Sequence, residues 1–475
     1  MRHRFTWIIL TLAWAVVVSA DARAQMPSAK PDLARLADEA QVWLSDLVRI
    51  NSVNPPGNEA AVAKYISAIF QKEGIPNEVI DMAPGRSIVV ARLQAGPLAD
   101  PANALLLVAH QDTVGVDPKK WSVDPFGAVV RDGYLWGRGS IDDKAMLTAN
   151  IATMVELKRS GARLGRDVLF LATDDEEQSG AASIKMTIQK YWDKIACAYA
   201  LNEGGRVMLK DNKVQYVGVQ ASEKVAYNVT VSATGLSGHA SMPRPESAIV
   251  HLATAIEKLG AYQVPAQPNT ITRRYFEQLS KIEDDEIGKW MRALETPERA
   301  DLAVKHLSEL SPMWNSMLRD TIAPTMLQAG VRVNIIPSEA TANLNVRMLP
   351  GHSIDELIGQ FAKVVNDPQI RFQLGPDPDE NSPPSDITSA LFQTIERLTP
   401  QDFPGAITVP LMGTGATDSA SLRLHKVQAL GLNPFPLTEA DALRVHGDEE
   451  RIPIDSFHKG VIFLYHVVSE FASSK

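Results

Sequence analysis

Apolar and polar positions along the chain fall into blocks that predict strands and helices in alternation. Short apolar runs with the length of buried strands lie at 87–93, 105–109, 167–173 and 196–201. Apolar residues at helical spacing predict helices at 32–50, 144–159, 182–192 and 456–472. This alternation predicts an α/β domain with a mostly parallel sheet flanked by helices, in which functional side chains gather at strand ends.

The pattern changes near residue 221, where a second unit begins. Alternating strands are expected at 225–233, 331–336 and 341–348, with helices at 245–259 and from Ser353 onward. The charged stretch 265–324 reads as an irregular, partly helical insertion. The order predicts a small α+β sandwich inserted into the α/β domain. We therefore expect the larger domain at 25–221 and 383–475, the inserted unit at 222–382 and a hinge within 375–385.

The first residues predict a targeting signal. Arg2, His3 and Arg4 precede an apolar run at 7–20, and Ala22–Arg23–Ala24 matches a small-x-small cleavage site. The prediction is a signal peptide at 1–24, a mature chain that begins at Gln25, and a periplasmic or secreted protein. A retained membrane anchor is the weaker alternative, because the apolar run is shorter than the roughly 20 residues of a spanning helix.

Composition narrows the classes of protein that fit. The 475 residues favour two domains, and 45% hydrophobic and 22% charged residues are typical of a globular protein. A formal net charge of −9 argues against a nucleic-acid partner. The single cysteine, Cys197, permits no internal disulfide, so stability is expected to come from a large core or from metal.

Metal-ligand residue types recur at predicted strand ends and loops. The candidates are His110, Asp142, Glu177, Glu203 and His446. Two imidazoles and three carboxylates suit zinc better than magnesium or calcium. Because five ligands exceed one tetrahedral shell, we expect two zinc ions that share a carboxylate and activate water.

Taken singly, each of these signals has a plainer explanation. Consecutive aspartates at 142–143 are usual at a helix start, and the acidic run 174–177 fits a solvated turn. An isolated histidine after a strand is seldom a ligand. The coincidence of all of them on strand ends of one α/β domain favours the metal site.

The motifs that carry these residues resemble those of the family-20 di-zinc metallopeptidases. This family includes aminoacylases, succinyl-diaminopimelate desuccinylase, bacterial glutamate carboxypeptidase and vacuolar Gly-X carboxypeptidase. The resemblance covers nearly the whole mature chain. It rests on AHQDTV at 109–114, GRGSIDDK at 137–144, DEE at 175–177, NEG at 202–204 and HG at 446–447.

The resemblance implies a role for each ligand-type residue. His110 and Glu203 would hold one zinc, Glu177 and His446 the other, and Asp142 would bridge them. Glu176 would be the general base that takes a proton from the attacking water and passes it to the leaving amine. Asp112, two residues after His110, would hold the imidazole in one tautomer.

The resemblance also implies that the larger domain is the catalytic domain and that the inserted unit is a lid or dimerisation domain. The inserted unit and a late loop would supply the remaining groups. In the segment GHAS, His239 resembles a histidine that stabilises the tetrahedral oxyanion, in relatives across a homodimer interface. Asn334 and Arg347 match positions that hold the substrate carboxylate, for which a guanidinium is well suited. The glycine-rich loop with Gly413, Thr414 and Gly415 resembles a substrate-binding loop.

The sequence thus predicts an exported di-zinc hydrolase that cleaves an amide bond next to a free carboxylate. Expected substrates are small peptides cut at the C-terminal residue or N-acyl amino acids. A biosynthetic deacylase such as a desuccinylase is the alternative within enzymes, although export argues against it. A catalytically dead zinc-binding protein is the alternative outside enzymes, and the presence of Glu176 and every ligand argues against it.

Overall fold

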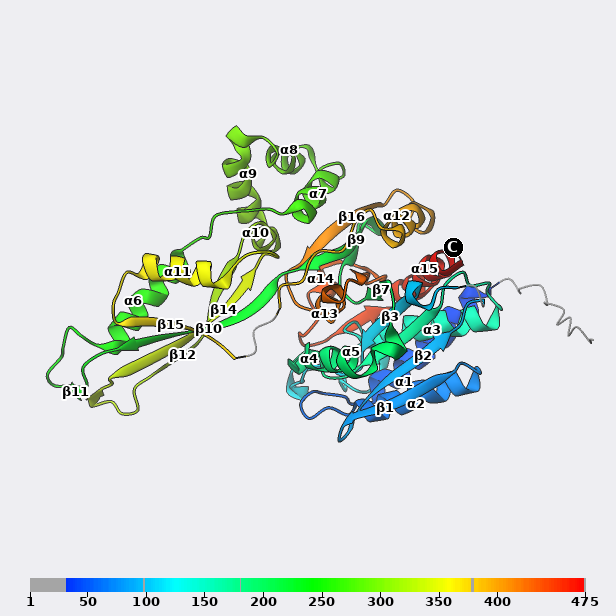
Figure 1. Cartoon of the computed structure of the whole chain (residues 1–475), viewed down its shortest axis with the longest axis horizontal. Helices are drawn as coiled ribbons and strands as arrows, with labels where there is room; N and C mark the ends of the chain where they lie inside the picture. The colour runs from blue at the N-terminus through cyan, green and yellow to red at the C-terminus, as the bar shows by residue number, and fades with distance from the viewer. Residues whose placement is uncertain (1–30, 97–98, 180, 377–379, 474–475) are drawn as a thin grey trace, which may run out of the picture.

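The computed structural model describes residues 31–96, 99–179, 181–376 and 380–473. The predicted signal peptide at 1–24 and the predicted N-terminus at Gln25 lie outside the described residues. Among the described helices, none combines the length and apolarity that crossing a membrane requires. The chain forms two sheet-centred parts, a larger one on the right of Figure 1 and a smaller one on its left.

The larger part is built on a mixed ten-stranded sheet. The strand order is β1-β2-β6-β3-β7-β17-β9-β8-β18, with β16 paired to β9. Their bounds are β1 Asn77–Ala83, β2 Arg86–Leu93, β3 Leu105–His110, β6 Val168–Thr173, β7 Tyr199–Asn202, β8 Arg206–Lys210, β9 Lys213–Glu223, β16 Ile407–Gly413, β17 Gln428–Gly431 and β18 Pro436–Leu437. The middle strands β6, β3, β7 and β17 are parallel, so their carboxyl ends meet at one edge.

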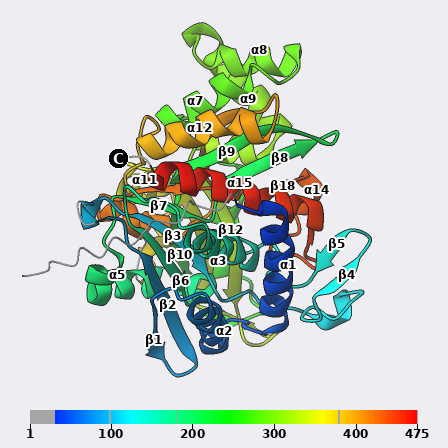
Figure 2. The same ribbon diagram turned by 90° about the vertical axis from the view of Figure 1, so that its right-hand side faces the viewer.

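Helices cover both faces of this sheet. One face carries α1 (Leu33–Arg49), α2 (Glu59–Lys72), α3 (Lys144–Arg159), α12 (Ala390–Asp402) and α15 (Ile454–Ser473) (Figures 1 and 2). The other carries α5 (Ala181–Ile195) and α13 (Ser419–Leu424). The helix α3 packs among α1, α15 and the sheet, and it is buried on nearly every side. The predicted α/β class is confirmed.

The smaller part, the lid, has an antiparallel sheet with helices on one face. Its strand order is β12-β14-β10-β15, with bounds β12 Thr321–Ala329, β14 Glu339–Met348, β10 Val225–Thr234 and β15 Ile370–Leu374. Helices α6 (Ala248–Ala261) and α11 (Ile354–Val365) share one hydrophobic core with these strands. The burial of β10 alternates along its length, as expected for a sheet with one covered face.

The prediction of a strand at 331–336 is wrong over most of that range. The strand is β12, which precedes it, and only Ile335–Ile336 forms a short strand, β13, paired with β11 (Gly238–His239). The alternating valines there protrude at the outer end of the lid, where Val331 is 90% exposed. The sequence signal of β12 is weak because it contains Pro324, beside which the pairing with β14 has a bulge.

The stretch 265–324 contains four helices that pack on the larger part. They are α7 (Thr270–Leu279), α8 (Asp285–Ala293), α9 (Pro297–Leu310) and α10 (Pro312–Leu318). The apolar face of α7 packs against β16, and its Tyr275 and Phe276 are buried in the core of the larger part. Figure 1 shows these helices above the junction of the two parts. These helices lie between lid elements in the sequence, but their buried residues belong to the hydrophobic core of the larger part.

A small sheet completes the larger part and joins two distant segments. It contains β4 (Val129–Arg131), β5 (Tyr134–Trp136) and β19 (Arg451–Pro453), in the order β19-β5-β4. The pairing of β19 with β5 brings the loop that begins at Gly137 beside the loop that ends at Glu450. These two loops carry two of the predicted metal ligands.

Candidate metal centre

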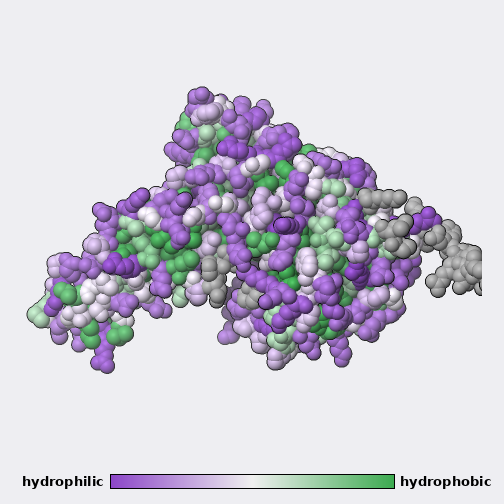
Figure 3. Space-filling view, viewed as in Figure 1, coloured by the Kyte–Doolittle hydropathy of each residue, from purple (hydrophilic) through white to green (hydrophobic). Residues whose placement is uncertain are grey.

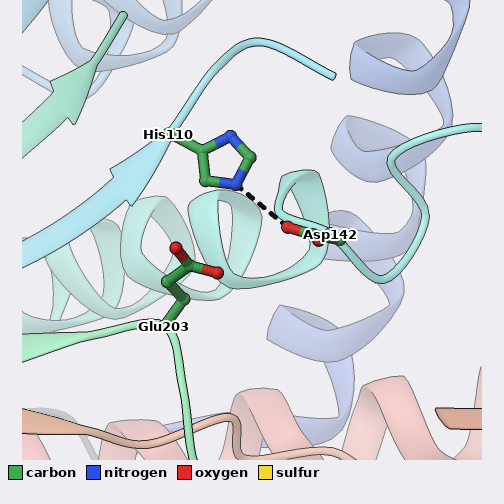
Figure 4. Close-up of side chains that lie close together, drawn as sticks. All are labelled: His110, Asp142 and Glu203. Carbon is green, nitrogen blue, oxygen red and sulfur yellow. Dashed lines mark hydrogen bonds and ion pairs between the residues drawn. The ribbon is translucent and has the colours of Figure 1, made fainter. Parts of the chain in front are cut away.

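Three of the predicted ligands meet at the carboxyl edge of the parallel strands. His110 is the last residue of β3, Glu203 follows β7, and Asp142 lies in the loop before α3 (Figure 4). The distance from His110 Nε2 to Asp142 Oδ1 is 2.9 Å. One ligand atom from each of the three residues lies within 4.8 Å of the others. Neighbouring parallel strands end at the same edge, which explains why residues so distant in sequence converge.

A second group forms on the other oxygen of Asp142. His446 Nε2 lies 3.1 Å from Asp142 Oδ2 and 3.1 Å from Glu177 Oε2. Glu177 belongs to the short helix α4 (Glu176–Ser179), which follows β6. Asp142 is therefore common to both groups, and its two oxygens face different partners. This is the arrangement expected of a carboxylate that bridges two metal ions.

Asp112 supports both groups from behind. Its Oδ1 lies 3.3 Å from His110 Nδ1, which also contacts the Asp112 backbone carbonyl at 3.1 Å. The same carboxylate accepts hydrogen bonds from the backbone N–H groups of Glu176 and Glu177, at 3.2 and 3.1 Å. Asn54 Nδ2 donates to it at 2.8 Å. A single buried aspartate thus orients one ligand and fixes the loop that carries another.

The electrostatics of the cluster favour a bound cation. Burial alone would lower the pKa of His110, but hydrogen bonds to Asp112 and Asp142 raise that pKa well above its usual value. Hydrogen bonds to Asp142 and Glu177 raise the pKa of His446 to about 10. Burial raises the pKa of the Glu203 carboxyl well above its ordinary range. The pKa of each imidazole is thus raised by neighbouring carboxylates, and bound metal ions would neutralise the negative charge of those carboxylates.

The donor set fits divalent metal ions. Imidazole nitrogens and carboxylate oxygens are the ligands of catalytic zinc sites. Glu177 Oε1 is buried and has no hydrogen-bond partner among the described residues, so it is available to a ligand. His110, Asp142 and Glu203 would hold one ion, and Asp142, Glu177 and His446 the other.

Glu176 lies beside the ligand groups without belonging to either. It begins α4, adjacent in sequence to Glu177, and it lines the same cavity as Glu177 and His446. Burial raises the pKa of its carboxyl well above the usual value, with a further contribution from the charge of Asp418. A carboxylate in such a place is suited to accept and return a proton.

Glu450 is a buried residue that the sequence analysis missed. Its carboxylate accepts hydrogen bonds from the backbone N–H groups of Gly139, Ile141 and Asp142, at 2.7 to 3.1 Å. It also pairs with Arg138 Nη1 at 2.5 Å, and Arg138 Nη2 donates to the carbonyl of Gly447. This pair joins the loop of Asp142 to the loop of His446. Its place four residues after His446 was the available signal.

The cavity beside the metal centre has a volume of about 600 Å³ and lies between the two parts of the molecule. Glu176, Glu177 and His446 line it from the larger part, and Arg347 lines it from β14 of the lid. Arg347 Nε donates to Asn345 Oδ1 at 3.0 Å. Of the three loop residues predicted to bind substrate, Gly415 lines the cavity. Gly413 is the last residue of β16 and Thr414 follows it, and neither is among the residues that line the cavity.

The structure does not bring two predicted site residues to this cavity. His239 and Asn334 lie exposed at the outer end of the lid, around the pairing of β11 with β13. Figure 1 places this end far from the larger part. His239 Nδ1 contacts Ser241 Oγ at 2.8 Å, and the Asn334 carbonyl accepts a hydrogen bond from Ala240.

Comparisons with known proteins bear on the same features. The model of the Peptidase family M20/M25/M40 matches residues 106–470. The protein named "Probable carboxypeptidase S-like 2" of Dictyostelium discoideum is 30% identical over 77% of this chain and 71% of its own length. The human N-fatty-acyl-amino acid synthase/hydrolase PM20D1 is 28% identical over 76% of this chain and 73% of its own length.

Solved structures agree in fold. The M20 family metallo-carboxypeptidase Sso-CP2 of Sulfolobus solfataricus superposes with a TM-score of 0.67 at 17% identity. The match covers 92% of this chain and 99% of that one. The resemblance, the fold class and the prediction of a metallopeptidase or amidohydrolase are thereby confirmed. Because the family model spans most of the chain, including every predicted metal ligand, the protein belongs to the Peptidase family M20/M25/M40.

Proposed function

We propose that the protein is an exported di-zinc hydrolase that cleaves an amide bond next to a free carboxylate. Its substrates would be small peptides cut at the C-terminal residue or N-acyl amino acids. The observation that supports this most is that Asp142 is shared by two ligand groups beside a cavity lined by Arg347. The names of two relatives, a probable carboxypeptidase S-like protein and an N-fatty-acyl-amino acid synthase/hydrolase, support the same class of substrate.

The residues around the cavity divide the chemistry among them. Zinc ions held by the two groups would polarise the carbonyl and make water acidic. Glu176 would take the proton of the attacking water and return it to the leaving amine, as its place beside Glu177 allows. Asp112 would keep His110 in one tautomer. The guanidinium of Arg347 would bind the substrate carboxylate.

Substrate and metal dependence can be tested together. The purified chain should contain about two metal ions and lose activity to a chelator, because a co-catalytic site requires both. A panel of dipeptides and N-acyl amino acids should be compared with the matched methyl esters. Esters should react about tenfold more slowly or worse, because Arg347 then lacks a charged partner. Full activity without metal, or equal activity on esters, contradicts the proposal.

The roles of the two adjacent glutamates can be separated. Glu176→Gln should keep both metal ions and reduce kcat by about a hundredfold or more, because no proton acceptor remains. Glu177→Gln should lose metal, because it removes a charged ligand. Metal analysis and steady-state kinetics check both variants. If both kept full metal content and lost equal activity, the assignment of roles would be wrong.

Export is supported by the sequence of the first 24 residues. The basic start, the apolar run and the Ala22–Arg23–Ala24 site together predict cleavage before Gln25. Expressed with its own N-terminus in a bacterium, the chain should be recovered from the periplasm or medium with Gln25 as its first residue. Mass spectrometry of the purified chain measures this. An uncleaved chain in the cytoplasm contradicts export.

A homodimer through the lid would explain the position of His239. The edge strand β12 exposes Met326 and Leu327, and the neighbouring helix α6 exposes Ile249 and Val250. Figure 3 shows hydrophobic residues at the surface of the lid. An open edge beside apolar side chains suits pairing with a second copy. His239 would then reach the cavity of the partner and stabilise the oxyanion there.

Mixed dimers test this arrangement. A Glu176→Gln chain and a His239→Ala chain should each be nearly inactive, because each lacks one group in every site. After subunit exchange, the site with an intact Glu176 receives His239 from the other chain, so activity should return. Up to about a quarter of the native activity is expected when half of the dimers are mixed and each has one repaired site. Proven mixed dimers without activity, or an active monomer, rule the idea out.

A further inference from the structure

The loop at 413–417 faces the cavity and begins where the chain crosses to the lid. Gly415 and Thr417 line the cavity together with Glu176. Gly413, the last residue of β16, is paired in register with Glu223, the last residue of β9. A single residue, Lys224, separates Glu223 from the lid strand β10. The cavity loop and the crossing to the lid are therefore adjacent in space.

Two residues at the crossing hold this loop. Glu223 is only 3% exposed, and its carboxylate accepts two hydrogen bonds from Thr417. The Thr417 hydroxyl donates at 2.9 Å and the Thr417 backbone N–H at 3.3 Å. The backbone N–H of Lys224 donates to the Gly413 carbonyl at 3.0 Å. Both ends of the loop, Gly413 and Thr417, are thus hydrogen-bonded to Lys224 and Glu223, where the chain passes from β9 to the lid.

The charge of Glu223 is balanced by Arg423. Arg423 is 2% exposed, and its Nη2 lies 3.2 Å from Glu223 Oε1. Its guanidinium nitrogens have no hydrogen-bond partner of good geometry among the described residues. The ion pair with Glu223 is therefore the contact that neutralises this buried cation, and removing Glu223 alone would leave it uncompensated.

Gln220 extends the connection toward a metal ligand. Its Nε2 donates to Glu223 Oε2 at 2.9 Å, and its Oε1 accepts the N–H of Gly205 at 3.4 Å. Gly204 and Gly205 directly follow Glu203 in the sequence. A Cβ on Gly413 would lie 2.5 Å from Gln220 Oε1, so a glycine is needed for the side chain to fit there.

The crossing itself is anchored to the larger part. The Lys224 ammonium is buried and donates to the carbonyls of Ser316 and Arg319, at 2.9 and 2.8 Å. Ser316 belongs to α10, one of the helices whose buried residues share the catalytic core. Lys224 also donates to Thr321 Oγ1, on the first residue of the lid strand β12, at 3.1 Å. The crossing is therefore held by hydrogen bonds from one buried side chain to both the α10 side and the lid side.

We propose that Glu223 is a positioning residue for substrate binding. It holds the loop at 413–417 through Thr417, and through Gln220 it connects that loop to the segment at 203–205 that carries the metal ligand Glu203. This rests on the proposed amidohydrolase function. The loop contacts bound substrate through the ground state and the transition state alike, so displacing it should raise KM while kcat and metal content change little. The ion pair with Arg423 would keep the Glu223 carboxylate oriented toward Thr417.

The test replaces the ion pair without stranding a charge. In Glu223→Met/Arg423→Met both buried groups become apolar and similar in length, a change that buried pairs often tolerate. This variant should raise KM about tenfold, since it removes hydrogen bonds from a charged acceptor. Thr417→Val should raise KM as well, whereas Thr417→Ser, which keeps the hydroxyl, should remain near native.

A double-mutant cycle shows whether Glu223 acts through Thr417. Adding Thr417→Val to the double variant should raise KM by less than about twofold further, because the hydrogen bond is already gone. Independent roles would multiply the two effects. Thr408→Val is the matched control: the Thr408 hydroxyl donates to Thr399 at 2.8 Å on the other end of β16. It should leave KM unchanged.

Hydrogen exchange supplies a readout that needs no substrate. The Thr417 amide loses its acceptor in the Glu223→Met/Arg423→Met variant, so peptides that cover 413–418 should exchange faster, while peptides from α3 should not. If the native enzyme hydrolysed no amide substrate, the proposed function would fail, but exchange would still test the loop contact. Multiplicative effects on KM, or unchanged exchange at 413–418, overturn the proposal.

Discussion

The structure depends on an excess of buried negative charge at the carboxyl edge of one sheet. Among the described residues, the carboxylates that converge there include Asp112, Asp142, Glu176, Glu177 and Glu203, and they are joined by the imidazoles of His110 and His446. Taking several carboxylates out of water is unfavourable unless cations and hydrogen bonds compensate them. The raised pKa values of His110 and His446 show that the imidazoles respond to this charge. Bound metal ions would convert the same charge from a cost into binding energy.

Hydrogen bonds from backbone N–H groups compensate part of the buried negative charge. Asp112 uses the N–H groups of the Glu176 loop, and Glu450 uses those of the Asp142 loop, so backbone dipoles share the compensation. The Glu450–Arg138 pair joins segments that are 312 residues apart in sequence. The geometry of Asp142 therefore depends on contacts made long after its own motif. A substitution at Glu450 would therefore act on the metal centre without replacing a ligand.

The lid is joined to the larger part through a crossing at Lys224, which is bonded to the last of the helices α7–α10. Their apolar faces complete the catalytic core, and their C-terminal end receives the Lys224 side chain. The cavity lies where a lid residue, Arg347, faces the metal groups of the larger part. Under the proposed function, substrate recognition and catalysis would be divided between the two parts, with the loop at 413–417 held on the larger part. This division fits an enzyme that must select its substrate and then exclude water.

The sequence alone determined the features that are local. His110 and the acidic residues at 174–177 follow apolar strands directly, and Asp142 precedes a helix start, so pattern and motif sufficed to find them. The tertiary structure decided what depends on distant contacts. The partners of Glu450, Glu223 and Arg423 lie far away in the sequence, so the sequence alone gave no sign of these contacts. The charged residues of α7 likewise obscured the apolar face that packs in the core. The strand β12 was missed because its proline and exposed side chains give no alternation, and pairing with β14 decides its form. Helix and strand propensities depend on neighbouring residues, whereas buried ion pairs and strand pairing depend on contacts between segments that are distant in sequence.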